Sequence, residues 1–176
     1  MLLSVQQKYI LDVLQKLGYI RRRQLDTLVR EKFRCPDLEI SAARMDAMLR
    51  QLRVGTANVH LDNEFVWISS AQPDTLCLEA VDVMLELSEG RPKDFKTGLE
   101  SPEILRFSWG ENFRLFTVAE LSFPIHSTVE TLASKKRVVW ISANGTAPEG
   151  LTLPPKHFFA ARQKDGSHRF YGSNRP

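Results

Sequence analysis

The stretch that decides the fold reads SAARMDAMLRQLRVG (41–55), TANVHL (56–61), DN (62–63) and EFVWIS (64–69). Its first part carries apolar residues at the spacing of an amphipathic helix, namely Met45, Met48, Leu49 and Leu52. Ser41 precedes this pattern and can cap the helix with its hydroxyl group, while Gly55 can end it. The stretch therefore predicts a helix over 41–53 with one face toward a core.

A hairpin is predicted directly after this helix. Residues 58–61 and 64–69 alternate between apolar and polar types, as half-buried strands do. Asp62 and Asn63 lie between them and suit a two-residue turn with positive φ. A helix, a short connection and a hairpin, in this order, form an arrangement that DNA-binding domains present to a duplex. Read alone, the helix fits better as a core helix with solvated arginines, and only the hairpin that follows favours the DNA-binding interpretation.

Two further helices are predicted before this stretch. The first ends at Gly18, and its apolar positions are Val5, Tyr9, Ile10, Val13, Leu14 and Leu17. A short extended link, 19–20, leads to a second helix that opens with Arg21, Arg22 and Arg23. Three arginines at a helix start oppose the helix dipole, at a cost of up to about 0.3–1 kcal/mol each. This placement indicates either an external anion, such as a DNA phosphate, or a solvated surface run.

The segments YILDVLQKLGYI, RRRQLDTLV, SAARMDAMLRQLRVG and FVWIS together resemble a winged helix-turn-helix of bacterial regulators. This resemblance covers roughly the first 70 residues. The layout of the whole chain also resembles an uncharacterised family from bacterial mobile elements. That family is similar in plan to replication-relaxation proteins of plasmids and conjugative elements, which join a winged helix to a nuclease-like α/β domain. The resemblance implies an N-terminal winged-helix domain over 1–70.

A second domain is predicted over 74–176, after a linker at 71–74. Its elements are a helix (74–89), two strands (104–109 and 113–121), a helix (127–134), a strand (138–142) and a hairpin (157–163 with 168–171). The first helix is apolar nearly all round. Its polar positions form one narrow stripe that we expect to be solvated, at Glu79, Asp82, Glu86 and Glu89. The expected fold class is α+β, a winged helix-turn-helix followed by a small α/β domain.

The order of elements in the second domain is similar to that of restriction-endonuclease-like folds. Their chemistry needs an acidic residue near one strand and Glu-x-Lys near the next, to hold Mg²⁺ and activate water. Here Glu120 is followed by Ser122 where lysine is required, and no aspartate lies within 104–109. The cysteines and histidines have no metal-ligand spacing. The sequence therefore predicts no enzyme, no catalytic or metal-binding residues, no cofactor and no DNA cleavage.

Composition and charge agree with a globular, DNA-associated protein. Residues 1–70 contain 11 Lys and Arg against 8 Asp and Glu, so the whole net charge of +3 lies there. Cys35 and Cys77 lack a CxxC spacing and suit a reducing compartment. No apolar run approaches the roughly 18 residues of a membrane span, and the N-terminus has no signal-peptide pattern. We therefore expect a cytoplasmic protein without membrane association.

The leading hypothesis is a duplex-DNA-binding protein of a bacterial plasmid or mobile element. Arg44, Arg50 and Gln51 would face bases in a major groove. The phosphate contacts would come from Arg21, Arg22, Arg23 and Arg53. The second domain would form a homodimer or bind a protein partner. The alternatives are a protein-interaction adaptor that uses a winged-helix scaffold without DNA, and a divergent nuclease-like domain that lacks catalytic residues.

Overall fold

The structure is a computed structural model that describes residues 2–36, 39–56, 58–135 and 137–172. The chain divides into two compact units, Met1–Asp74 (unit 1) and Thr75–Pro176 (unit 2). Its five helices and two sheets among the described residues confirm a mixed α and β protein. Within the described ranges, no helix has the length and apolar character needed to cross a membrane.

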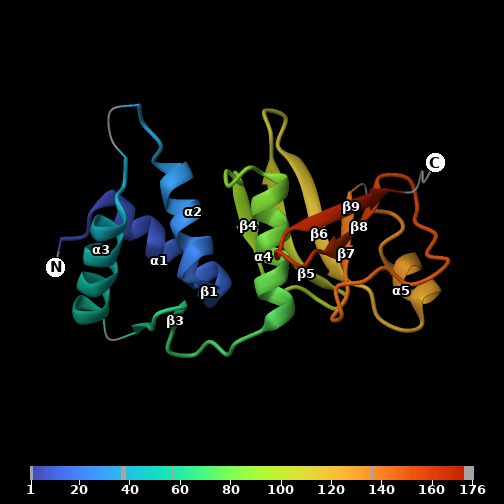
Figure 1. Cartoon of the computed structure of the whole chain (residues 1–176), viewed down its shortest axis with the longest axis horizontal. Helices are drawn as coiled ribbons and strands as arrows, with labels where there is room; N and C mark the ends of the chain where they lie inside the picture. Colours follow the sequence, from blue (N-terminus) through green and yellow to red (C-terminus); the bar gives the residue numbers. More distant parts are fainter. Residues whose placement is uncertain (1, 37–38, 57, 136, 173–176) are drawn as a thin grey trace. The chain divides into compact units, whose positions relative to one another are not determined.

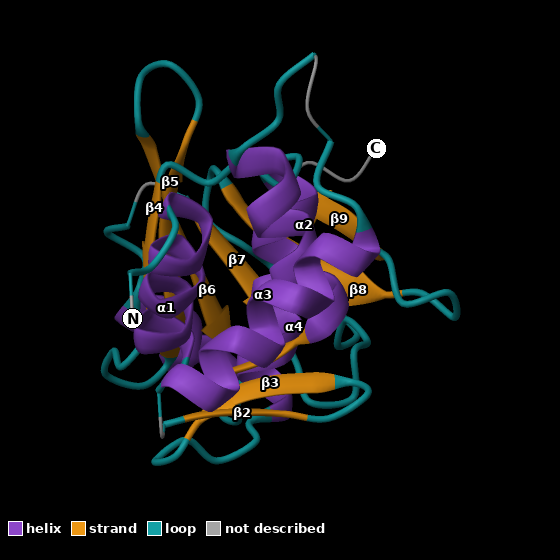
Figure 2. Cartoon of the chain, turned by 90° about the vertical axis from the view of Figure 1, so that its left-hand side faces the viewer, coloured by secondary structure: helices purple, strands orange, loops and turns teal. Residues whose placement is uncertain are grey.

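Unit 1 combines three helices with a small antiparallel sheet. Its elements are α1 (Val5–Leu17), β1 (Tyr19–Arg21), α2 (Arg22–Lys32), α3 (Ala42–Gly55), β2 (Val59–Leu61) and β3 (Phe65–Ile68). The strand order is β1-β3-β2. The segment expected to be an extended link is thus a strand, because Tyr19 and Ile20 pair with Trp67 and Val66 of β3. The helices α1 and α3 lie on one side of the β2–β3 hairpin (Figure 2).

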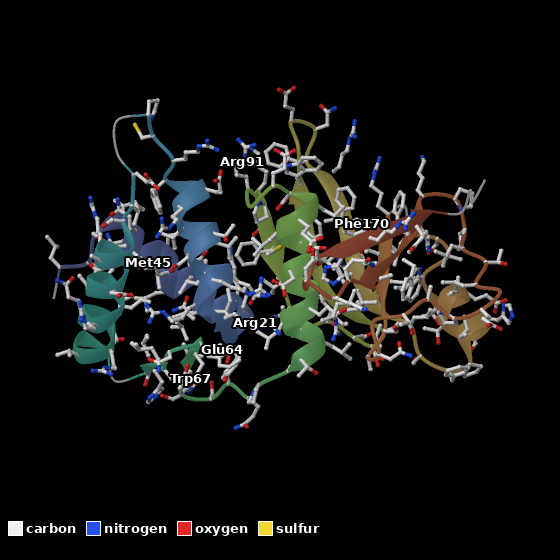
Figure 3. All side chains as sticks on the ribbon, in the orientation of Figure 1. Arg21, Met45, Glu64, Trp67, Arg91 and Phe170 are labelled. Carbon is white, nitrogen blue, oxygen red and sulfur yellow. The ribbon has the colours of Figure 1, made fainter. Side chains whose placement is uncertain are left out.

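Side-chain caps and apolar faces explain the helices of unit 1. The Oγ of Ser4 accepts a hydrogen bond from the backbone N–H of Gln7, and the side chain of Gln7 accepts one from the Ser4 N–H. Ser41 caps α3 as predicted, since its Oγ accepts from the Arg44 N–H at 3.2 Å. The helices and sheet share one core, and Met45 points into it (Figure 3). Its fully buried members include Ile10, Leu14, Ile20, Leu25, Leu28, Leu49, Leu52 and Val66.

The β2–β3 turn differs from the prediction. Asp62 and Asn63 do not have positive φ, so the turn is not of the type expected for them. Instead, the Asp62 carboxylate accepts hydrogen bonds from the backbone N–H groups of Glu64 (2.8 Å) and Phe65 (2.7 Å). The turn is therefore held by the Asp62 side chain and not by a backbone conformation with positive φ.

Unit 2 is built on a six-stranded sheet of order β4-β5-β6-β7-β8-β9. Its elements are α4 (Thr75–Leu87), β4 (Asp94–Lys96), β5 (Glu103–Trp109), β6 (Arg114–Glu120), α5 (Ile125–Thr131), β7 (Val138–Ile141), β8 (His157–Arg162) and β9 (His168–Gly172). Strands β6, β7 and β8 are parallel, and the other pairs are antiparallel. Helix α4 lies across the sheet (Figure 1). Residues of α5 and the 147–153 loop pack with Trp140 and Phe159.

Three predictions about unit 2 need correction. Strand β4 lies between the predicted helix 74–89 and the predicted strand 104–109, where no element is predicted from the sequence. Helix α5 spans Ile125–Thr131, so it begins two residues earlier and ends three residues earlier than the predicted helix 127–134. Strand β5 begins at Glu103, one residue earlier than predicted, and so includes a carboxylate.

Candidate nucleic-acid interface

The exposed face of α3 carries small side chains and arginine. The four residues Met45, Met48, Leu49 and Leu52 turn toward the core. The helical period places Ala43, Ala47, Arg50 and Val54 on the opposite face, and Val54 is 84% exposed. Alanines keep the helix backbone close to the surface. The helix can therefore come close to the floor of a groove as wide as the major groove of DNA.

Three of the predicted site residues lie on this helix with their charges available. Arg44, Arg50 and Arg53 are exposed, and no side-chain partner is found for any of them among the residues that the structure describes. Arg50 lies near the middle of the exposed face, while Arg44 and Arg53 lie at its two edges. The three guanidinium groups therefore spread across the face.

Gln51, the fourth predicted site residue on α3, is tied to α1. Its Oε1 accepts a hydrogen bond from Nε2 of Gln7 at 2.9 Å, and Gln7 is only 4% exposed. The same Gln7 side chain also closes the cap of α1. Gln51 thus joins two helices, and the expectation that it faces bases loses support.

The three arginines at the start of α2 have different surroundings. Arg22 forms an ion pair with Asp46 of α3, and its backbone N–H donates to the Glu64 carbonyl oxygen at 2.7 Å. Arg21 ends β1, with its N–H donating to Oε1 of Gln24, whereas Arg23 is exposed on the first turn of α2. Arg22 therefore links α2 to α3, which removes it from the set that we expect to contact phosphate.

A carboxylate near this ion pair shows how closely the two helices approach. Oδ1 of Asp26 is buried and has no hydrogen-bond partner among the described residues. Burial raises the pKa of Asp26 and the charge of Asp46 adds to this, while Arg30 and Arg22 act in the opposite direction. Arg22 thus interacts electrostatically with two carboxylates of the protein, those of Asp46 and Asp26.

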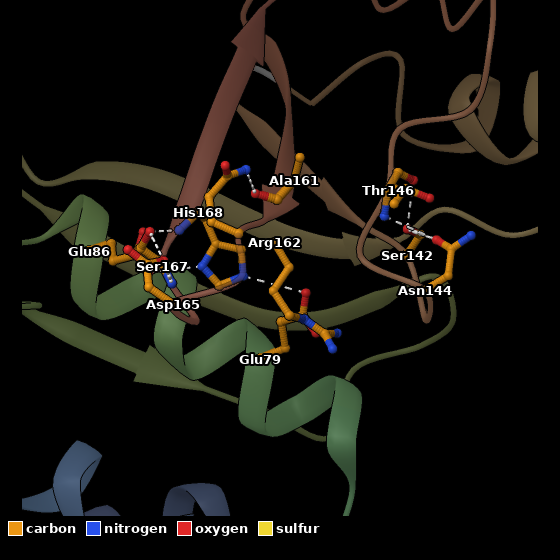
Figure 4. A network of polar contacts seen from close by, with 11 residues as sticks. Glu79, Glu86, Ser142, Asn144, Thr146, Ala161, Arg162, Asp165, Ser167 and His168 are labelled. Carbon is orange, nitrogen blue, oxygen red and sulfur yellow. Dashed lines mark hydrogen bonds and ion pairs between the residues drawn. The ribbon is translucent and has the colours of Figure 1, made fainter.

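The acidic stripe of α4 is solvated only in part: Glu86 and Glu89 are exposed, as predicted, whereas Glu79 and Asp82 are buried. Glu79 is 5% exposed and Asp82 is 8% exposed. Glu79 forms an ion pair with Arg162 of β8, and the His168 ring of β9 lies between Glu79 and Glu86 (Figure 4). The stripe therefore fixes the β8–β9 hairpin to α4.

The His168 ring has carboxylate oxygens at both of its nitrogens. Nδ1 donates to Glu86 Oε1 at 2.9 Å, and Nε2 lies 3.4 Å from Glu79 Oε1. Glu86 Oε2 also accepts a hydrogen bond from the backbone N–H of His168 at 3.0 Å. The His168 side chain is 1% exposed. The network thus joins the buried His168 ring to two carboxylates of α4.

His157 occupies a second buried polar site in unit 2. It is fully buried, and its Nδ1 accepts a hydrogen bond from the indole N–H of Trp140 at 3.2 Å. Its Nε2 therefore carries the proton and donates to the Lys135 carbonyl oxygen at 3.0 Å. Burial lowers the pKa of His157, partly offset by the bond to Lys135. The neutral ring ties β7 and β8 to the end of α5.

We expect the stability of unit 2 to fall between pH 7 and pH 5.5. The pKa of His157 is lowered in the folded state. As the pH falls below the ordinary histidine pKa of about 6.5, His157 therefore binds a proton more readily in the unfolded chain than in the folded one, which favours unfolding. One proton can change the free energy of unfolding by at most about 1.4 kcal/mol per pH unit. Urea unfolding at several pH values measures this. The His157→Gln variant should lose the dependence, and the exposed-site control His126→Gln should keep it.

The positions that a nuclease would use hold another arrangement. Glu103 begins β5 and is in register with Ala119 of β6. Its carboxylate pairs with Arg106, and Nζ of Lys135 lies 3.7 Å from its other oxygen. No group of three histidine, cysteine or acidic residues that could hold a metal occurs in the described part of the chain. Glu103 is thus held by cations of the protein itself.

Sequence reasoning missed the buried networks of unit 2 and the ion pair of Arg22. The spacing of Glu79, Asp82 and Glu86 is the same for a solvated stripe and for a stripe covered by another element. The sequence did contain an indication of this burial. Apolar residues lie nearly all round α4, which indicates that other elements pack against the helix on every side. Comparison of the chain with protein-family models, curated proteins and solved structures found no match.

Proposed function

We propose that the chain binds duplex DNA and that unit 1 acts as a winged helix, with α3 in the major groove. The observation that carries this proposal is the exposed face of α3. It combines three arginines, Arg44, Arg50 and Arg53, which lack partners within the described ranges, with small side chains between them. The element order of unit 1 and its strand order β1-β3-β2 support the winged-helix interpretation.

The arrangement suggests a division of work among the arginines. Arg50, near the middle of the exposed face, is best placed for a base edge, where a bidentate contact with guanine gives roughly 1–3 kcal/mol of discrimination. Arg44 and Arg53, at the edges of the face, suit the two flanking phosphate backbones. Arg23 can add a phosphate contact from the start of α2, where the helix dipole favours an anion.

The proposal extends to the cellular setting and to unit 2. The sequence resemblance to mobile-element proteins supports a role for the protein in a bacterial plasmid or mobile element. Unit 2 would then serve homodimerisation or a protein partner, and not catalysis. The pairing of Glu103 with Arg106 and Lys135 supports a non-catalytic role, because those cations occupy the carboxylate oxygens that a metal ion would need.

The test is binding to a random-sequence duplex, followed by fluorescence anisotropy over a series of salt concentrations. The three proposed phosphate contacts, from Arg23, Arg44 and Arg53, predict a slope of log K against log salt of about −2.7. We expect saturable binding at about 50 mM salt, where phosphate contacts are strong. Absence of binding at that concentration would contradict the proposal.

A protein-interaction adaptor without DNA is the second candidate. The observation in its favour is the acidic tip of the β2–β3 hairpin, where Asp62 and Glu64 are exposed. Hydrogen bonds from the N–H groups of Phe65 and Glu64 lower the pKa of Asp62, which keeps this carboxylate charged. A wing with this tip repels phosphate, so the hairpin contributes little to a grip on DNA.

A further inference from the structure

Four ring side chains form a continuous row on the sheet of unit 1, which we call the aromatic row: Phe65, Tyr19, Trp67 and His60. The ring centroids of Tyr19 and Phe65 are 5.0 Å apart, and those of Tyr19 and Trp67 are 5.6 Å apart. The His60 ring stacks on Trp67 at 5.7 Å with an interplanar angle of 21°. The row crosses all three strands.

The row lies on the sheet face opposite the helices. Tyr19 and His60 are both in register with Trp67, so they share its face. The alternate residues Ile20, Val66 and Val59 are buried on the other face, against the helices. Members of the aromatic row keep partial exposure, and His60 is exposed. The sheet of unit 1 thus has one face covered by helices and one face that carries the aromatic row.

One end of the row is acidic. Asp62 and Glu64 precede Phe65 on the hairpin, and both are exposed. Burial raises the pKa of Tyr19, and the charges of Asp62 and Glu64 raise it further. Their negative field therefore reaches the centre of the row. Arg21 is also on this face, in register with Phe65, so the end carries two negative charges and one positive charge.

We propose that the aromatic row is a docking surface for a protein segment that presents arginine side chains. Ring faces are negative in their quadrupole and attract guanidinium groups that stack on them, by about 0.5–1 kcal/mol at exposed sites and more when desolvated. Asp62 and Glu64 add charge attraction at one end. The same carboxylates repel phosphate, which disfavours stacked nucleotides as the occupant. This surface is separate from α3, so one domain could bind DNA and a partner at once.

The probe for this proposal is the synthetic peptide acetyl-RGSRGSR-amide. Its control is the same peptide with citrulline, which is neutral and has the shape of arginine. Binding is followed by NMR through the indole N–H signal of Trp67, assigned with a Trp67→Phe variant. We expect the arginine peptide to shift this signal in a saturable way, and the citrulline peptide to bind at least threefold more weakly.

Two double variants, each of which removes two negative charges, locate the contact. In the double variant Asp62→Asn, Glu64→Gln, the side-chain turn is retained because the Asn amide oxygen can accept the same hydrogen bonds. We expect this variant to lose at least threefold in affinity for the arginine peptide. The matched control Glu111→Gln, Glu149→Gln removes two exposed charges from unit 2 and should bind as the parent does.

Four outcomes would overturn the proposal. The first is equal binding of the arginine and citrulline peptides, and the second is no shift of the Trp67 signal up to 5-fold molar excess at millimolar protein. The third is a larger and tighter response to a single-stranded oligothymidylate, which would make the row a base-stacking surface. A fall in affinity for the arginine peptide in both double variants alike would also contradict it.

Discussion

Replacing Arg44, Arg50 and Arg53 together by alanine is expected to lower the affinity for duplex DNA about 10²–10³-fold at roughly 0.1 M salt. In the proposed arrangement Arg44 and Arg53 contact phosphate, and each lost phosphate contact removes about 0.9 from the slope of log K against log salt, so the slope should fall by about 1.8. The three arginines have no side-chain partner among the described residues, so the fold should tolerate their loss. Anisotropy titrations at four salt concentrations give both quantities.

A matched variant separates this site from overall charge. Replacing Lys93, Arg114 and Lys164 of unit 2 by alanine removes the same charge from exposed positions. This variant should lose less than about threefold in affinity, since uncontacted charges act only through a screened field. Equal losses in the two triple variants would show that α3 is not in the groove. In that case the adaptor function would be favoured.

Replacing Glu79 by glutamine is expected to lower the free energy of unfolding of unit 2 by about 2–3 kcal/mol. The carboxylate is 5% exposed and compensates the charge of Arg162, which would remain in place without it, and it also lies 3.4 Å from Nε2 of His168. Breaking a fully buried pair costs about 3–5 kcal/mol, and the value here is smaller because the Arg162 side chain is 43% exposed. Urea unfolding followed through Trp109 and Trp140, in a Trp67→Phe background, measures it.

The control for Glu79 is Glu89, which follows α4. Its carboxylate pairs with Arg91 at 3.0 Å, but both side chains are more than half exposed. The variant Glu89→Gln should therefore change the free energy of unfolding by no more than about 0.5 kcal/mol. If the two variants behave alike, the buried cluster contributes no more than a surface pair. A change in the urea dependence itself would instead indicate altered compactness.

Local patterns predicted most of the elements, and pairing between distant segments accounts for the rest. The helices α1, α2 and α3 follow from apolar periodicity, and the β2–β3 hairpin follows from alternation around Asp62. The strands β1 and β4 have only three residues each, too few for a periodic signal, and exist because β3 and β5 offer backbone partners. These two segments are strands because they pair with β3 and β5, and their own sequences alone do not indicate it.

The same limit applies to the candidate interface. Arg44, Arg50 and Arg53 could be placed on an exposed face from the positions of Met45 and Leu49, because one helix decides that question. The roles of Arg22 and Gln51 could not, since they depend on Asp46 and Gln7, which lie on other helices. A charge on a helix surface has the same spacing whether it meets solvent or a neighbouring helix.

The bonds between α4 and the last hairpin also bear on how the chain is made. Glu79 and Glu86 of α4 find their partners Arg162 and His168 more than 80 residues later. During synthesis on the ribosome, α4 emerges first, with carboxylates whose counter-charges do not yet exist. Until β8 and β9 have left the ribosome, Glu79 can be hydrated or buried without a partner, but it cannot be both buried and neutralised. The fold of unit 2 is therefore completed only after β8 and β9 have been translated.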